Sequence, residues 1–141
     1  MTSIDFYFNA SDRLTVACRL ASKAFAHRKK LLIFAPESDT AHRIDRMLWT
    51  WQQLSFVPHC LASDPLATQT PVLITRESAA PPECDVLLNL AAECPPFFER
   101  YPRLLEVVGL TNEEKDLGRG RYRFYKVRGY AIENHDLAGR G

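Results

Sequence analysis

Basic and aromatic residues alternate in one stretch close to the end of the chain. The segment from Gly118 to Tyr130, GRGRYRFYKVRGY, contains five arginine or lysine residues and four aromatic residues. Guanidinium and ammonium groups bind carboxylates and phosphates, and aromatic rings add apolar or stacking surface beside them. The stretch therefore predicts one of three things: a site for an acidic peptide, a site for a nucleic acid strand, or a basic face covered only by water.

A helix is expected to position these cations. Residues 111–114, TNEE, form a capping box, in which a Thr and a Glu three residues apart satisfy backbone N–H groups at the start of a helix. Along that helix Lys115, Arg119 and Arg123 fall at four-residue spacing. Tyr122 follows Arg119 by three residues and therefore lies on the same side of the helix. We call these four residues the ridge. Like charges at this spacing repel, so three cations without an acid between them indicate an external anion.

The net charge of the chain and a partial sequence motif help to decide whether that anion is a nucleic acid or an acidic peptide. Residues 128–135, RGYAIENH, begin like the RNP1 signature of RNA-recognition strands, but Glu133 and His135 stand where that signature has apolar and aromatic residues. The formal net charge is only +1, which argues against tight binding to DNA. An acidic peptide is therefore the favoured ligand, and a direct single-stranded nucleic-acid-binding module is the alternative.

Aromatic residues gather in a second segment. Residues 48–61, LWTWQQLSFVPHCL, hold two tryptophans and a phenylalanine within eight residues, at the end of an expected helix. Any one of them can belong to the core, but burial of all three together is less expected. Trp and Phe are enriched at the centres of protein interfaces, so the segment predicts a second surface for a protein partner.

Short apolar runs and helical periodicity alternate along the chain. Strands are expected at 3–9, 31–35, 71–75, 85–90, 103–108 and 126–132, helices near 14–25, near 40–49 and after residue 111, and loops around one strand over 78–96. Continuous apolar runs such as LLIFA are typical of parallel strands buried on both faces. We therefore expect an α/β fold: a single domain with a mostly parallel central sheet, helices on both faces and Rossmann-like topology.

The glycine, cysteine and histidine positions argue against a nucleotide enzyme and against a metal site. The first strand-to-helix turn, FNASDR, has no glycine, all six glycines lie at 109 or later, and no P-loop motif occurs. The four cysteines and four histidines are scattered without metal-ligand spacing. Polar residues such as Asp39, His42 and Asp45 are expected on a solvated helix face. We expect no nucleotide-binding loop, no catalytic residue, no cofactor and no metal.

Length and composition indicate one globular body. The 141 residues, 46% of them hydrophobic, suit a single domain over residues 1–141, with 135–141 expected as a flexible tail. No apolar run approaches the roughly 18 residues of a membrane helix, and the start, MTSIDFYFNASDR, lacks the pattern of a secretory signal. A cytoplasmic protein without membrane contact is therefore expected.

The chain resembles a known family in three segments: FYF at 6–8, RIDRMLWTWQQLSFVPHCLA at 43–62, and RYRFYKVRGY at 121–130 with Lys115 upstream. These are similar to the chi subunit of bacterial DNA polymerase III, and the similarity covers nearly the whole chain. The resemblance implies a non-catalytic accessory subunit of the clamp-loader assembly. Such a subunit links the replicase to single-stranded DNA-binding protein by gripping its acidic C-terminal tail, and a separate surface holds the psi subunit or a repair helicase.

The resemblance also implies roles for individual residues. The tail-binding positions of the family match Lys115, Arg119, Tyr122 and Arg123, and its psi or helicase surface matches Trp49 and Phe56. It further implies a monomer that joins a larger complex and contacts single-stranded DNA indirectly.

Two departures from the family concern structure. The 78–103 segment shows little family pattern. Gly118 and Gly120 stand where relatives carry better helix formers. Each costs a helix about 1 kcal/mol relative to Ala, so propensity alone determines the middle of this helix only weakly.

Overall fold

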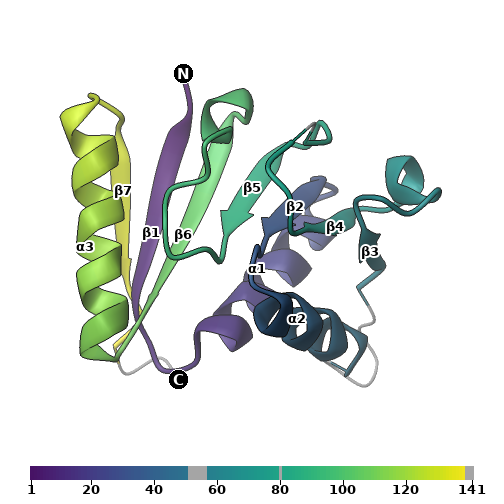
Figure 1. Cartoon of the computed structure of the whole chain (residues 1–141), viewed down its shortest axis with the longest axis horizontal. Helices are drawn as coiled ribbons and strands as arrows, with labels where there is room; N and C mark the ends of the chain where they lie inside the picture. Colours follow the sequence, from purple (N-terminus) through teal and green to yellow (C-terminus); the bar gives the residue numbers. More distant parts are fainter. Residues whose placement is uncertain (51–56, 80, 139–141) are drawn as a thin grey trace.

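The computed structural model describes residues 1–50, 57–79 and 81–138. Within these residues seven strands form one sheet in the order β3-β4-β2-β5-β6-β1-β7, and every pairing is parallel (Figure 1). The strands are β1 (Ser3–Ala10), β2 (Leu31–Phe34), β3 (His59–Leu61), β4 (Val72–Thr75), β5 (Val86–Asn89), β6 (Arg103–Gly109) and β7 (Ile132–Asp136). The expected α/β class with a parallel central sheet is confirmed.

Helices cover both faces of this sheet. In the described part of the chain they are α1 (Arg13–Ala26), α2 (Ser38–Thr50) and α3 (Asn112–Val127), with short 3-10 turns η1 (Ala67–Gln69) and η2 (Phe98–Arg100). Leu31 and Ile33 pack with α1 and α2, whereas Leu32 and Phe34 pack with α3 and η2. Because successive strand residues point to opposite faces and both faces are buried, β2 is apolar at every position. No described helix combines the length and the hydropathy needed to cross a membrane.

The capping box acts as the sequence predicts. The Thr111 hydroxyl accepts a hydrogen bond from the Glu114 backbone N–H at 3.1 Å, and the Glu114 carboxylate accepts one from the Thr111 backbone N–H at 3.3 Å. Helix α3 begins at Asn112 and continues without a break through both glycines. Packing of α3 on the sheet therefore outweighs the low helix propensity of Gly118 and Gly120.

The end of α3 differs from the sequence-based expectation. The sequence predicts the closing strand at 126–132, but the helix runs to Val127 and the last strand, β7, begins at Ile132. Gly129 has a φ of +83°, the left-handed conformation that ends helices, and the Tyr130 N–H bonds to the Tyr125 carbonyl. The strand therefore starts only after this turn.

The predicted start of the flexible tail also differs from the structure. The sequence predicts a tail over 135–141, but His135 and Asp136 pair with β1 as part of β7. The apolar alternation that usually marks a strand is weak here because β7 is an edge strand, with polar residues on its accessible side. Residues 139–141 lie outside the described part of the chain.

Candidate functional site

A groove opens between α3 and the carboxyl ends of β1 and β6. Its volume is about 390 Å³, within the range of roughly 300–1,000 Å³ typical of ligand pockets. Phe6 and Phe8 of β1 and Val108 of β6 supply its apolar wall. Lys115 and Arg119 of α3 place two cations at the same groove. We call this the α3 groove; it can bind a ligand that is both apolar and anionic.

The structure brings the predicted ridge together. Lys115, Arg119 and Tyr122 line the α3 groove, and Arg123 lies in an adjoining depression that shares Arg119 and Tyr122. That depression, of about 330 Å³, also includes Lys126. The four predicted residues thus form one continuous surface along α3.

Tyr122 is held in place from two sides. Its ring meets the ring of Phe6 edge to face with centroids 5.1 Å apart. Its hydroxyl oxygen accepts a hydrogen bond of 3.3 Å from the side-chain amide of Asn134 on β7. Because the ring is half-buried and fixed at both ends, it presents a defined apolar surface to the groove.

One acid lies beside the ridge, which the spacing argument missed. The Arg119 Nη1 atom lies 2.9 Å from the Asp116 Oδ1 atom, with 71% and 74% of the two side chains exposed. An exposed ion pair of this kind is worth little because water screens it. The Asp116 carboxylate therefore competes only weakly with an incoming anion for Arg119.

Arg121 does not belong to the cationic surface, although it is one of the five basic residues of the stretch. Its side chain is only 4% exposed, and its Nε atom lies 2.9 Å from Oε1 of the fully buried Glu106 on β6. Its Nη1 atom donates to the Ala92 carbonyl at 2.9 Å. Arg121 thus faces the sheet while the ridge faces outward.

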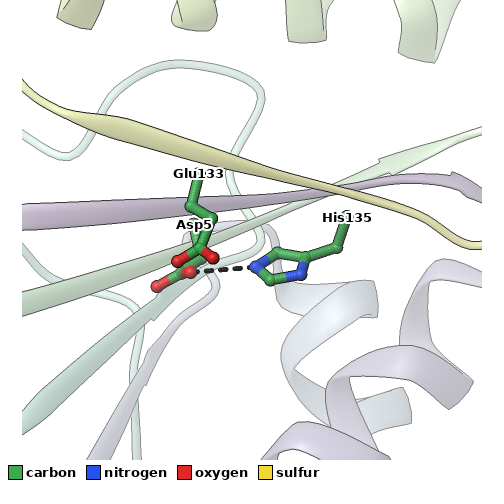
Figure 2. A group of neighbouring side chains, drawn as sticks. All are labelled: Asp5, Glu133 and His135. Carbon is green, nitrogen blue, oxygen red and sulfur yellow. Dashed lines mark hydrogen bonds and ion pairs between the residues drawn. The ribbon is translucent and has the colours of Figure 1, made fainter.

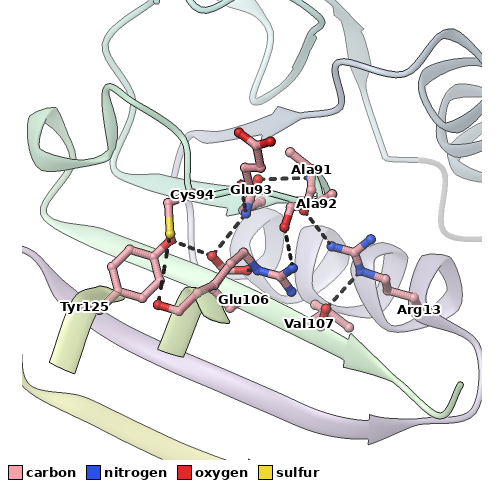
Figure 3. Close-up of polar contacts among 10 residues, drawn as sticks. Arg13, Ala91, Ala92, Glu93, Cys94, Glu106, Val107 and Tyr125 are labelled. Carbon is pink, nitrogen blue, oxygen red and sulfur yellow. Dashed lines mark hydrogen bonds and ion pairs between the residues drawn. The ribbon is translucent and has the colours of Figure 1, made fainter. Parts of the chain in front are cut away.

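The Glu106 carboxylate also accepts hydrogen bonds from two other side chains beneath α3 (Figure 3). Its Oε2 atom accepts hydrogen bonds from the Tyr125 hydroxyl at 2.6 Å and from the Asn89 side-chain amide at 3.0 Å. Burial, and then the charge of Glu106, raise the pKa of Tyr125, so its hydroxyl stays protonated and donates. Among the described residues no buried side-chain nitrogen or oxygen lacks a partner. The network fixes the orientation of α3 about its own axis and so determines which of its residues face the groove.

Arg13 extends the polar contacts at this end of the sheet. Its Nε atom donates to the Val107 carbonyl at 2.9 Å and its Nη2 atom to the Ala91 carbonyl at 3.2 Å (Figure 3). Burial lowers the pKa of the Arg13 guanidinium. Related α/β folds bind phosphates at the first turn between strand and helix. Here the first residue of α1 instead ties this turn to β6.

Gly118 allows the close approach of α3 to β6. A β carbon at this position would lie 2.7 Å and 2.9 Å from the two methyl carbons of Val108, closer than real contacts permit. Gly120, two residues on, has nothing within 4 Å of such a β carbon. The two glycines therefore have different roles, which the sequence does not distinguish.

Only part of the second predicted surface falls in the described residues. The Trp49 side chain at the end of α2 is 57% exposed and meets the ring of His59 edge to face, with centroids 5.0 Å apart. His59 is buried, and its Nδ1 atom lies 2.7 Å from the Val57 carbonyl oxygen. Phe56 lies outside the described residues. The structure thus shows one exposed aromatic residue of that surface.

The cysteines pack as apolar side chains. All four are free thiols; Cys18 is on the buried face of α1, and the other three are partly buried on the α3 side of the sheet. Burial raises the pKa of Cys18 to about 12 and that of Cys84 to about 11. Both groups therefore remain protonated thiols at neutral pH, which fits a packing role.

A cluster that sequence reasoning missed lies on β1 and β7. Asp5, Glu133 and His135 bring ligand-type atoms within 4.8 Å of one another (Figure 2). Asp5 is about 130 positions away from Glu133 and His135 in the chain, so no local spacing pattern signals the cluster.

Comparison with solved structures gives the fold. The C-terminal domain of Dbp5 from Saccharomyces cerevisiae superposes with a TM-score of 0.62, covering 96% of this chain and 90% of that one, at 10% sequence identity. At such low identity the likeness shows a shared α/β arrangement alone.

Comparison with known sequences gives the family. The family model described as DNA polymerase III chi subunit, HolC, matches residues 1–133. DNA polymerase III subunit chi of Pseudomonas aeruginosa is 31% identical over 97% of this chain and 98% of its own length. The Escherichia coli protein of the same name is 28% identical over 83% of this chain and 80% of its own length. This chain therefore belongs to the family of DNA polymerase III chi subunits, accessory subunits of the bacterial replicase.

Proposed function

We propose that this chi subunit binds the acidic C-terminal tail of single-stranded DNA-binding protein in the α3 groove, and so links that protein to the clamp loader. The main support for this proposal is the groove itself, where Lys115 and Arg119 lie beside an aromatic and aliphatic wall. A peptide end with an apolar last residue and a free carboxylate needs this combination of surfaces. The subunit acts as a cytoplasmic, non-catalytic monomer within the larger complex and contacts single-stranded DNA only through its partner.

Each residue of the ridge has a distinct task in this proposal. Arg119 exchanges its exposed contact with Asp116 for a carboxylate of the tail, and Lys115 and Arg123 attract further acidic groups. Tyr122, already braced by Phe6, packs against the terminal apolar side chain. A single small site of this kind is expected to bind with a micromolar dissociation constant, about −8 kcal/mol.

The experiment is a calorimetric titration with a synthetic tail peptide of the single-stranded DNA-binding protein from the same organism. The same peptide without its last residue tests the apolar contact, and a bare oligonucleotide tests the alternative of direct nucleic acid binding. Binding of only the intact peptide supports the proposal. Tight binding of the oligonucleotide, with a steep salt dependence, would replace it with the nucleic-acid-binding module.

A matched pair of arginine variants assigns the site. Arg119→Ala is expected to weaken peptide binding by about 1–3 kcal/mol, as for a hydrogen bond to a charged group. Arg43→Ala removes an exposed arginine from α2 instead, and its affinity should equal that of the wild type. Equal losses in both variants would mean that overall charge, and not the ridge, attracts the peptide.

We further propose that Trp49 and Phe56 bind the psi subunit or a repair helicase. The exposure of Trp49 at the end of α2, away from α3, supports a second surface that is separate from the groove. Phe56→Ala should then abolish capture of that partner and leave peptide binding intact. Loss of both activities together would instead indicate unfolding.

A further inference from the structure

The register of β1 and β7 places four side chains on one face of the sheet. Asp5 pairs with Glu133 and Tyr7 pairs with His135. Because strand residues two apart share a face, all four project from the same side, opposite to Asn134 and the α3 groove. Figure 2 shows Asp5, Glu133 and His135 converging there from the two strands.

The three potential ligands are held at ligand-like separations. The Asp5 Oδ1 atom lies 2.9 Å from the His135 Nε2 atom, and one ligand atom from each of the three residues falls within 4.8 Å of the others. The His135 ring stacks on Tyr7 with centroids 4.5 Å apart and an interplanar angle of 13°. The Asp5 side chain is 7% exposed and that of His135 31%. Two of the ligands are therefore preoriented, and the exposed Glu133 can swing to meet them.

The charges around this cluster leave one carboxylate without a matching cation. Asp5 and Glu133 are directly opposite on neighbouring strands. Two like charges in this arrangement repel and destabilise the pairing. Arg103 of β6 neutralises one of them, with its Nε atom 2.9 Å from the Asp5 Oδ2 atom. When the imidazole is neutral, the two carboxylates and the Arg103 guanidinium sum to one negative charge, which attracts a cation.

We propose that Asp5, Glu133 and His135 form a binding site for a divalent transition metal ion of the zinc type. One imidazole nitrogen and two carboxylate oxygens, with water as a fourth ligand, complete a tetrahedral set. Zinc bonds of about 2.0–2.2 Å require the Asp5 oxygen and the His135 nitrogen to move apart from 2.9 Å to roughly 3.3 Å. The ion takes the place of the Nε2 proton, which moves to Nδ1 of the same ring.

The neighbours of the cluster act as supports for this site. Arg103 holds the Asp5 oxygen that does not face His135, in the way that hydrogen bonds orient metal-binding carboxylates. The positive charge of Arg103 also lowers the affinity for a cation, so binding weaker than at a structural zinc centre is expected. The bound ion would join the edge strand β7 to β1.

The test is a calorimetric titration of the full chain with Zn²⁺ in a buffer that does not chelate metals. The wild type is expected to bind one ion, and His135→Gln is expected to weaken that binding at least tenfold. His42→Gln is the matched control, because His42 is exposed on α2 and far from β7 in the fold. It should bind like the wild type. Absence of binding to the wild type at millimolar Zn²⁺, or equal affinity of the His135 variant, overturns the proposal.

Two further measurements separate this site from its alternatives. Glu133→Gln alters an exposed side chain, so the variant should fold while its affinity for Zn²⁺ falls several-fold. An unchanged affinity would mean that Glu133 is not a ligand and that the proposed site is wrong. Co²⁺ should give visible absorption of a tetrahedral site that the His135 variant lacks. A thiolate charge-transfer band in the near ultraviolet would instead place the metal on cysteine and overturn the assignment.

Discussion

Gly118 of α3 lies so close to Val108 of β6 that any β carbon at position 118 would force the Val108 side chain to shift. A β carbon there would lie 2.7 Å from a methyl carbon of Val108. Gly118 and Val108 also line the α3 groove beside Lys115, Arg119 and Tyr122, so this contact forms part of the groove wall.

Alanine substitutions at the two helical glycines should have opposite effects. Gly118→Ala is expected to lower the free energy of unfolding by about 1–3 kcal/mol, because overpacking displaces Val108. Gly120→Ala meets open space and should raise it by about 0.5–1 kcal/mol through the higher helix propensity of Ala. Urea unfolding of both variants measures the difference. Equal effects would show that propensity, and not the contact with Val108, governs position 118.

Removing the acid beside the ridge should strengthen tail binding. Asp116→Asn frees Arg119 from an exposed ion pair worth about 0.2–1 kcal/mol, so affinity for the acidic peptide should rise by a factor between about 1.4 and 5. Glu113→Gln removes the same charge from an exposed position in the first turn of α3 and serves as the control. Peptide titrations at low salt give the comparison; equal gains in both variants would point to net charge alone.

Neutralising Glu106 should destabilise the protein strongly. Glu106→Gln leaves the buried guanidinium of Arg121 without its counter-charge, at an expected loss of about 3–5 kcal/mol. Glu113→Gln, on the exposed side of α3, should cost less than about 1 kcal/mol. A loss at Glu106 as small as that of the control would mean that the buried pair contributes little to anchoring α3.

Replacing Arg28 by glycine should stabilise the protein. Arg28 follows the C-cap of α1 with a φ of +58°, whereas α3 has Gly129 at the equivalent position with a φ of +83°. The left-handed conformation costs a residue with a β carbon about 1–2 kcal/mol, and the added backbone entropy of glycine offsets part of the gain. Arg28→Gly should therefore gain about 1 kcal/mol in thermal or urea unfolding. Arg28→Ala should gain nothing; a similar gain from Ala would attribute the effect to charge.

Stability should fall at alkaline pH. Burial raises the pKa of Cys18 from 9.0 to about 12 and that of Tyr101 from 10.0 to about 12. Both groups bind their protons more tightly in the folded protein, so their contribution is complete below pH 9 and is lost as the pH rises towards 12. Tyr101→Phe should flatten this decline when urea unfolding is compared at neutral pH and at about pH 11. An equally steep decline in the variant would exclude Tyr101 as a contributor.

Local sequence patterns determined the class of fold and the start of the main helix. Apolar runs such as LLIF predict strands buried on both faces because every side chain of such a run needs apolar cover. The capping box predicts the beginning of α3 because Thr111 and Glu114 satisfy each other's backbone N–H groups within four residues. The spacing of Lys115, Arg119, Tyr122 and Arg123 likewise follows from helix geometry alone, and the structure places them on one surface.

Tertiary structure alone decided which of the basic residues face outward. Arg121 looks like its neighbours in the sequence, but it is buried because its partner Glu106 lies on β6, fifteen positions away. The end of α3 and the start of β7 depended on where the helix could pack and where β1 offered an open edge. The cluster of Asp5 and His135 joins residues 130 positions apart. Such contacts arise from strand register across the whole fold, which no local pattern of residues encodes.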